Sequence, residues 1–250
     1  MRTQSMLLII ALVAALAPRP VLAKSSPSPT HRTVGVSCGL PESDAEALVI
    51  LNNYYTSGNY SWDHANLTVA VQAHPNATAQ SVAEIHGAIA TWSSVIADCF
   101  DGLITLTDVT GTQPSEQKAA DIVIHYTPNA LGAAYGGIAH CGDHECPNVI
   151  VRSEYPFGRW GEEWSSVPPG YLGLTTLHEL GHALGVGHAT NLWESMDLMG
   201  YGWIDSAFLG GDEPILSDCD VDALAFVFAW ALEGSEPYPP AEGPYNCSLD

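Results

Sequence analysis

Two stretches of the chain have apolar residues at the spacing of an amphipathic helix. Residues 81–97 carry an apolar side chain at almost every third or fourth position, which places these side chains on one face. The second stretch, Tyr171–Leu184, follows a Pro-Pro-Gly sequence and is ended by Gly185. We therefore expect a helix in each.

Two further segments are expected to be helical. Asp218–Ala231 follows Ser217, a good N-cap, and has acidic residues in its first turn, where the helix dipole favours negative charge. Its apolar run, Ala223–Leu232, is too short to span a membrane, so we interpret it as a buried core helix. A shorter segment, residues 45–52, also has helical spacing.

Short apolar runs between these helices predict β-strands. They are Leu67–Val71, Leu103–Leu106, Ile122–His125 and Val149–Val151. The order along the chain is strand, helix, several strands, helix, irregular segment and helix. This order predicts an α/β or α+β domain.

The first residues read as a targeting signal. Arg2 precedes the apolar run Met6–Ala17, and Val21-Leu22-Ala23 offers small residues at a cleavage site. We expect a signal peptide over residues 1–23 and a secreted product. An N-terminal segment over 24–43, a catalytic domain over 44–235 and a C-terminal tail over 236–250 complete the expected organisation.

The chain is strongly acidic, with 28 Asp and Glu against 7 Lys and Arg and a formal net charge of −21. This balance argues against nucleic acid as a partner. It favours solubility in an acidic or salty medium over a preference for cationic substrates, because nothing in the sequence localises the charge. Four sequons fit a glycosylated, exported protein, and they lie at Asn59, Asn66, Asn76 and Asn246.

Six cysteines in an exported chain predict three disulfide bonds rather than a thiolate metal site. Cys141 and Cys146 are expected to pair, because only four residues separate them. The alternative for that loop is a zinc site made by His140, Asp143 and His144. The remaining four cysteines can pair in three ways, and they are Cys38, Cys99, Cys219 and Cys247.

Residues 178–188 contain a metal-binding pattern, His-Glu-Leu-Gly-His-Ala-Leu-Gly-Val-Gly-His. Residues four apart share a helix face, so His178 and His182 can present both imidazoles to one ion. Glu179 follows His178 on the helix, so it can lie near the ion without binding it. This is the position expected of the base that takes a proton from zinc-activated water. Gly185 tolerates the positive φ of a turn that returns His188 as a third ligand. The pattern predicts one catalytic zinc held by three histidines, rather than a helix that carries two histidines by chance.

This segment resembles the zinc signature of the metzincin endopeptidases, and its flanks resemble the matrixin branch of that family. Four other segments resemble, in order, the first strand, first helix, next strand and closing helix of matrixins; they are 62–71, 81–96, 120–126 and 216–227. The resemblance implies a twisted, mostly parallel sheet with an antiparallel edge strand, an active-site helix and a C-terminal helix. It also implies a methionine turn at residues 197–201, with Met199 preferred to Met196 as the turn residue.

The resemblance assigns substrate-binding residues as well. An edge strand above the cleft would pair with an extended peptide through main-chain hydrogen bonds. Its residues here are Gly137, Ile138, Ala139 and His140. Gly200 and Tyr201 begin the segment that walls the specificity pocket in the family.

Three departures from matrixins leave alternatives open. Most residues of the matrixin second zinc site are absent, so the sequence leaves open whether the chain binds a structural zinc or calcium ion. Cys38 lies in Cys-Gly-Leu-Pro without the arginine and aspartate of the matrixin blocking loop; it is either a zinc switch or, as the even cysteine count favours, half of a disulfide. Tyr201 stands where astacin-like and serralysin-like metzincins carry a tyrosine near the zinc; it either assists catalysis or lines the pocket.

The expected function is hydrolysis of peptide bonds in protein or peptide substrates by a secreted, monomeric zinc endopeptidase with no membrane span. Glu179 would take a proton from water and deliver it to the leaving amine. One alternative is a zinc-binding recognition module that has lost catalysis, against which Glu179 argues. Another is a non-peptidase zinc hydrolase acting on a small amide or ester, against which the resemblance argues.

Overall fold

The computed structural model describes residues 40, 48–50, 62–112, 119–127, 137–140, 148–152, 154–157, 163–166, 170–188, 198–200, 216–237 and 244–246. The expected signal peptide and N-terminal segment lie outside these ranges, apart from Leu40. Residues 34–250 belong to one compact unit.

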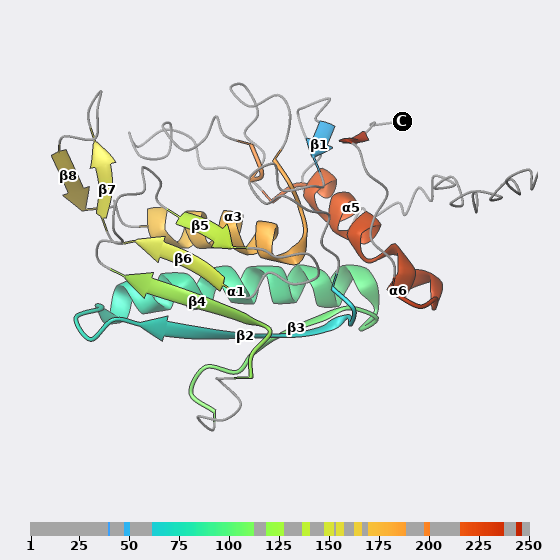
Figure 1. The fold of residues 1–250 in the computed structure, drawn as a ribbon, viewed down its shortest axis with the longest axis horizontal. Coiled ribbons are helices and arrows are strands. Elements are labelled where there is room, and N and C mark those ends of the chain that lie inside the picture. Colours follow the sequence, from blue (N-terminus) through green and yellow to red (C-terminus); the bar gives the residue numbers. More distant parts are fainter. Residues whose placement is uncertain are drawn as a thin grey trace, which may run out of the picture. The chain divides into compact units, whose positions relative to one another are not determined.

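A five-stranded sheet with the order β3-β2-β4-β6-β5 forms the centre of this unit (Figure 1). Its strands are β2 (Asn66–Ala73), β3 (Thr105–Asp108), β4 (Ile122–Thr127), β5 (Gly137–His140) and β6 (Asn148–Arg152). The first four strands of that order pair in parallel, whereas β5 is antiparallel to β6, with Ile138 opposite Ile150. The expected mostly parallel sheet with an antiparallel edge strand is therefore confirmed.

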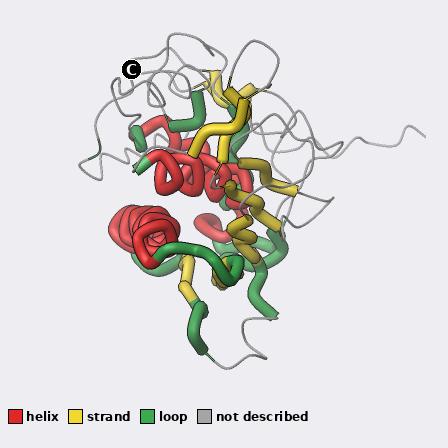
Figure 2. The backbone as a smooth tube through the Cα atoms, turned by 90° about the vertical axis from the view of Figure 1, so that its left-hand side faces the viewer, coloured by secondary structure: helices red, strands yellow, loops and turns green. Residues whose placement is uncertain are grey.

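Two long helices, α1 (Ala79–Phe100) and α3 (Tyr171–Leu184), lie on the same face of this sheet and pack against each other (Figures 1 and 2). The expected span of α3 is confirmed, and α1 extends the expected helix at both ends. Apolar side chains of the two helices and of the sheet form one core, in which Ile89, Trp92, Ile124 and Leu180 are buried. Burial of this apolar area stabilises the layered arrangement.

Local signals account for the limits of α1. Its N-cap, Thr78, accepts a hydrogen bond from the backbone N–H of Ser81 at 3.0 Å, which satisfies one of the free amides of the first turn. At the other end Asp101 takes a left-handed conformation with φ of 50° and stops the helix. The buried residues between these ends recur every three or four positions, as the sequence predicts.

The expected C-terminal helix is divided into α5 (Asp218–Val227) and α6 (Ala229–Glu233). Ser217 caps α5 in a reciprocal capping box with Asp220, which confirms the expected start. The break falls at Phe228. Both Phe228 and Trp230 are buried. Because residues two apart point about 200° apart on a straight helix, a change of direction lets both side chains reach the core.

The expected helix over residues 45–52 is wrong. Leu48–Ile50 form strand β1, which pairs antiparallel with β9 (Pro244–Asn246) near the other end of the chain. Three apolar residues do not distinguish helix from strand, and here a distant partner decides. A second antiparallel pair, β7 (Glu154–Phe157) with β8 (Glu163–Ser166), was not expected from the sequence.

Among the described helices, none is both long enough and apolar enough to cross a lipid bilayer.

Candidate metal centre

The C-terminal end of α3 is a glycine-terminated turn that reverses the chain. Gly185 has φ of 109°, which L-residues rarely adopt. Its N–H donates to the carbonyl of His182 at 2.9 Å, and the N–H of Val186 donates to the carbonyl of Gly181 at 3.0 Å. This pair of bonds is the Schellman motif, and it redirects the chain so that residues 186–188 return beside the helix.

Three imidazoles converge at this turn. Nε2 of His188 lies 3.0 Å from Nε2 of His182 and 3.3 Å from Nε2 of His178. The two helix histidines are buried and His188 is partly buried. Among the described residues, these three alone form a group of His, Cys, Asp or Glu side chains close enough to hold a metal ion.

Backbone carbonyls set the orientation of the two helix rings. Nδ1 of His178 lies 2.7 Å from the carbonyl oxygen of Leu198, and Nδ1 of His182 lies 2.8 Å from that of Val186. A carbonyl only accepts, so each Nδ1 carries the proton and donates it. Each Nε2 therefore presents a lone pair to the centre of the cluster.

The three rings are neutral at physiological pH. Burial lowers the pKa of His178 to about 3 and that of His182 to about 4, and it also lowers the pKa of His188. With both helix rings protonated on Nδ1, Nε2 of His188 could donate a proton to only one of the two neighbouring Nε2 lone pairs. At least one of the two short contacts is therefore not a hydrogen bond, whereas a cation between the nitrogens would satisfy all three lone pairs.

The residues present fit zinc. Nitrogens held about 2.0–2.1 Å from a tetrahedral zinc ion lie about 3.3–3.4 Å apart, close to the two Nε2 separations found here. Neutral imidazoles whose Nδ1 protons are held by backbone carbonyls are the form in which histidine binds zinc. The cluster is therefore compatible with a three-histidine zinc site.

Glu179 lies beside this cluster on α3 and is 8% exposed. Burial raises the pKa of its carboxyl group to about 8, while a hydrogen bond from the backbone N–H of Ala139 and the charge of Arg152 both lower it. A dication at the histidine cluster would lower this pKa further. The Ala139 contact also connects the carboxylate to the edge strand β5.

Arg152 is a charged neighbour of Glu179 that the sequence interpretation did not include. It is the last residue of β6 and is 2% exposed. Burial lowers the pKa of its guanidinium group, while the negative charge of Glu179 raises it. In return, the positive charge of Arg152 favours the ionised form of Glu179. One sequence signal could have indicated it: Arg152 follows the apolar run Val149–Val151 in a chain with only seven Lys and Arg residues.

The segment Leu198–Gly200 lies directly against α3. Besides the bond from His178 to Leu198, the buried side chain of Met199 fills the space next to Gly181. Its Sδ lies 2.6 Å from the point where a Cβ of residue 181 would stand. Gly181 therefore permits this close approach, because it has no Cβ.

Gly185→Ala should destabilise the fold by about 2–5 kcal/mol, since it adds backbone strain at positive φ to overpacking of the core. The added Cβ would stand 2.6 Å from Cγ1 of the buried Val227. The measurement is urea unfolding in excess chelator, so that metal binding does not contribute.

The matched control is Gly87→Ala in α1, where an added Cβ has no heavy atom within 4 Å. This change should leave stability unchanged or raise it by up to about 1 kcal/mol, because alanine favours helix. Equal unfolding free energies for the two variants would contradict the packing described for Gly185.

The other predicted residues are placed only in part. Gly137, Ile138, Ala139 and His140 form β5, which in the described part of the chain pairs with β6 alone. Cys99 is in a disulfide bond and Cys219 is buried, so the complete pairing scheme stays a prediction. Asn66 and Asn76 are exposed, whereas Asn246 is described only as part of β9. Several predicted residues lie outside the described ranges: Cys38, Asn59, Cys141, Asp143, His144, Cys146, Met196, Tyr201 and Cys247.

Comparisons with known proteins add little to this geometry. No protein-family model and no curated protein matches the chain. The structure is similar to high choriolytic enzyme 1, a hatching-enzyme zinc-protease from the medaka fish Oryzias latipes, at 18% identity and a TM-score of 0.30, with 51% of this chain and 50% of that chain covered. This chain thus spans about half the length of the medaka enzyme.

A second solved structure, the GM1-bound form of the ECX AB5 holotoxin, is similar at 12% identity and a TM-score of 0.37, with 82% of this chain and 92% of that chain covered. At TM-scores this low, neither likeness carries an argument about fold or function.

Proposed function

We propose that this protein is a zinc-dependent endopeptidase with its active centre at the C-terminal end of α3. The observation that carries the proposal is the convergence of three neutral Nε2 atoms beside the buried carboxylate of Glu179. Metal ligands alone would suit a structural site. Hydrolysis also requires a base for the attacking water, and Glu179, the residue after His178, can serve as that base.

Each residue has a distinct role in this proposal. His178, His182 and His188 would hold the metal. Zinc bound there supplies a Lewis acid, which polarises a carbonyl oxygen and makes water nucleophilic at neutral pH. The carboxylate of Glu179 would accept the proton of the attacking water and deliver it to the nitrogen of the leaving amine.

Substrate binding is assigned to strand β5. It lies at the edge of the sheet and its Ala139 N–H contacts Glu179, so a peptide paired with this strand would run close to the carboxylate. Main-chain pairing of this kind recognises extended peptide rather than particular side chains. We therefore propose protein or peptide substrates, with Gly200 and Tyr201 in the segment that selects among them.

Finer features of the proposal rest on the sequence. The flanks of the zinc segment support a matrixin-like metzincin, and the N-terminal apolar run supports export as a disulfide-bonded, glycosylated monomer. Tyr201 is proposed either as an oxyanion donor or as a pocket residue. Cys38 is proposed as half of a disulfide, with the zinc switch as the alternative.

The test is digestion of denatured casein by the purified protein, with and without a chelator. We expect cleavage that the chelator abolishes and added zinc restores. Cleavage that persists after zinc has been removed would contradict the proposal. Stoichiometric zinc without cleavage of casein or a peptide library would instead indicate a recognition module, and hydrolysis of small esters or amides alone would indicate a different hydrolase.

A further inference from the structure

Two buried tryptophans from separate elements donate hydrogen bonds to the backbone of α3. Nε1 of Trp62, which precedes β2, lies 2.9 Å from the carbonyl oxygen of Ala183. Nε1 of Trp92, in the middle of α1, lies 2.8 Å from the carbonyl oxygen of Leu177. Both indoles are almost completely buried.

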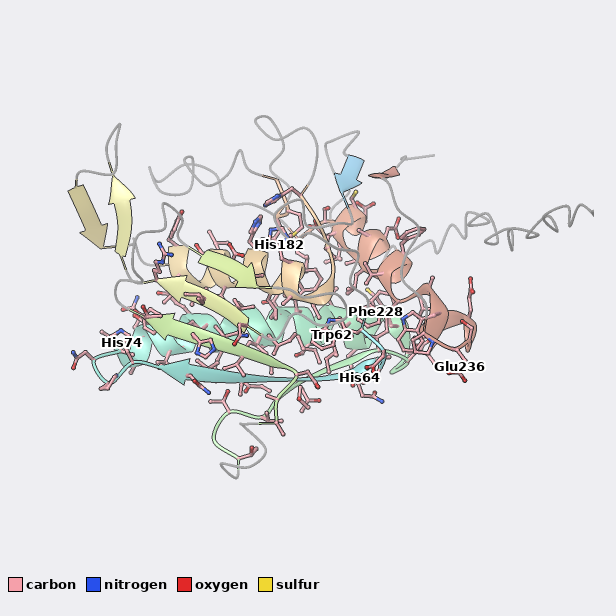
Figure 3. All side chains as sticks on the ribbon, in the orientation of Figure 1. Trp62, His64, His74, His182, Phe228 and Glu236 are labelled. Carbon is pink, nitrogen blue, oxygen red and sulfur yellow. The ribbon has the colours of Figure 1, made fainter. Side chains whose placement is uncertain are left out.

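The two acceptors flank the helix histidines. Leu177 immediately precedes His178, and Ala183 immediately follows His182. In the view of Figure 3, His182 lies above α3 and Trp62 lies below the C-terminal end of this helix. The bond from Trp62 therefore reaches the helix from a different side than the one on which His182 lies, and the bond from Trp92 comes from α1, which packs against α3.

The bond from Trp62 completes the end of the helix. The last four carbonyls of an α-helix have no partner within it. The glycine turn satisfies those of Gly181 and His182, and Trp62 satisfies that of Ala183. Trp62, about 120 residues earlier in the chain, thus provides the hydrogen bond that completes the end of α3, just before the turn that leads to His188.

The bond from Trp92 has a different role. The carbonyl of Leu177 lies within the helix and has a regular partner four residues on, so the indole uses its second lone pair. The same ring touches the glycine position, with Cζ2 3.3 Å from the point where a Cβ of residue 181 would stand. Trp92 therefore limits both the rotation of α3 and its distance from α1.

We propose that Trp62 and Trp92 are positioning residues for the metal centre, an inference that rests on the proposed zinc site. The rings of His178 and His182 are oriented by carbonyls of Leu198 and Val186, which lie outside α3. The three Nε2 atoms can converge only if the helix is held in one rotation and at one depth relative to those carbonyls. Metal sites require such placement to within about 0.5 Å.

The experiment compares Trp62→Phe and Trp92→Phe with Trp230→Phe in the full chain. All three changes replace a buried indole by a smaller ring and remove one N–H. Trp230 lies in α6, and its Nε1 has no hydrogen-bond partner among the described residues. The control therefore reports the cost of a smaller core residue without loss of a bond to α3.

Two readouts are used at a temperature where circular dichroism shows every variant folded. Zinc affinity is measured by competition with a chromophoric chelator, and the visible spectrum of the cobalt-substituted protein reports ligand geometry. Trp62→Phe and Trp92→Phe should each weaken zinc binding by about 10–100-fold, the usual cost of losing a group that orients metal ligands. They should also alter the cobalt spectrum, whereas Trp230→Phe should change neither.

The possible outcomes separate failure of the proposed function from failure of this inference. If the unmodified protein binds no zinc, the proposed function fails and this inference fails with it. The inference alone is overturned if the unmodified protein binds zinc and both Trp62→Phe and Trp92→Phe bind zinc as tightly as it does, with unaltered cobalt spectra. Equal weakening in all three variants also overturns it, because the effect would then be general loss of core packing. Should one variant not fold, the other tests the same claim from the opposite end of α3.

Discussion

Replacing Glu179 with glutamine should leave zinc bound and lower kcat for peptide hydrolysis by about 10²–10⁴-fold, the usual cost of losing a general base. The amide has the size and shape of the carboxylate, and its oxygen can still accept the hydrogen bond from Ala139. It cannot accept a proton from water. Because Glu179 is buried, solvent cannot readily take over that role.

The measurement is initial-rate kinetics on a peptide substrate together with the zinc content of the same sample. Glu84→Gln makes the same chemical change in α1, where Glu84 accepts a hydrogen bond from Gln80, and it should leave kcat unchanged. Full activity of Glu179→Gln at full zinc occupancy would show that another residue is the base.

His182→Ala should lose the metal itself, and peptide hydrolysis with it. Two of the three converging nitrogens would remain, and the carbonyl of Val186 would lose its donor. The fall in zinc affinity should exceed the roughly 10–100-fold cost of removing a residue that only orients a ligand. Metal analysis after gel filtration should therefore find far less than one zinc per chain.

His86→Ala is the matched control, since His86 pairs with Asp108 and is not among the three clustered histidines. This variant should retain zinc and activity. Stoichiometric zinc in His182→Ala would mean that the ligand set differs from His178, His182 and His188. Together with Glu179→Gln, the pair separates loss of the metal from loss of the base.

Much of the active helix is encoded locally. The Pro-Pro-Gly sequence marks the start of the helix Tyr171–Leu184, and Gly185 marks its end. The four-residue spacing of His178 and His182 places both side chains on one face of this helix. Ser217 and Asp220 likewise start α5 by bonds within four residues. These features could be predicted because caps, turns and helical periodicity depend on neighbours in sequence.

Other features depend on partners far away in the chain. Leu48–Ile50 has the spacing of a short helix, yet it is a strand because Pro244–Asn246 pairs with it. The helix expected to run to Ala231 breaks at Phe228, where two aromatic side chains enter one core. In both cases burial and pairing outweigh a local preference that is worth only a fraction of a kcal/mol per residue.

The sequence by itself determined the identity of the three converging histidines, the adjacent glutamate and the glycine turn that brings His188 back. Only the tertiary structure decided what surrounds them. The charge of Arg152 beside Glu179, the carbonyls that orient His178 and His182, and the indoles of Trp62 and Trp92 involve residues whose side chains carry no metal-binding pattern. Ligand spacing is a property of one helix, whereas the environment of a buried site is made by every element that packs against that helix, and periodicity along the chain does not encode those contacts.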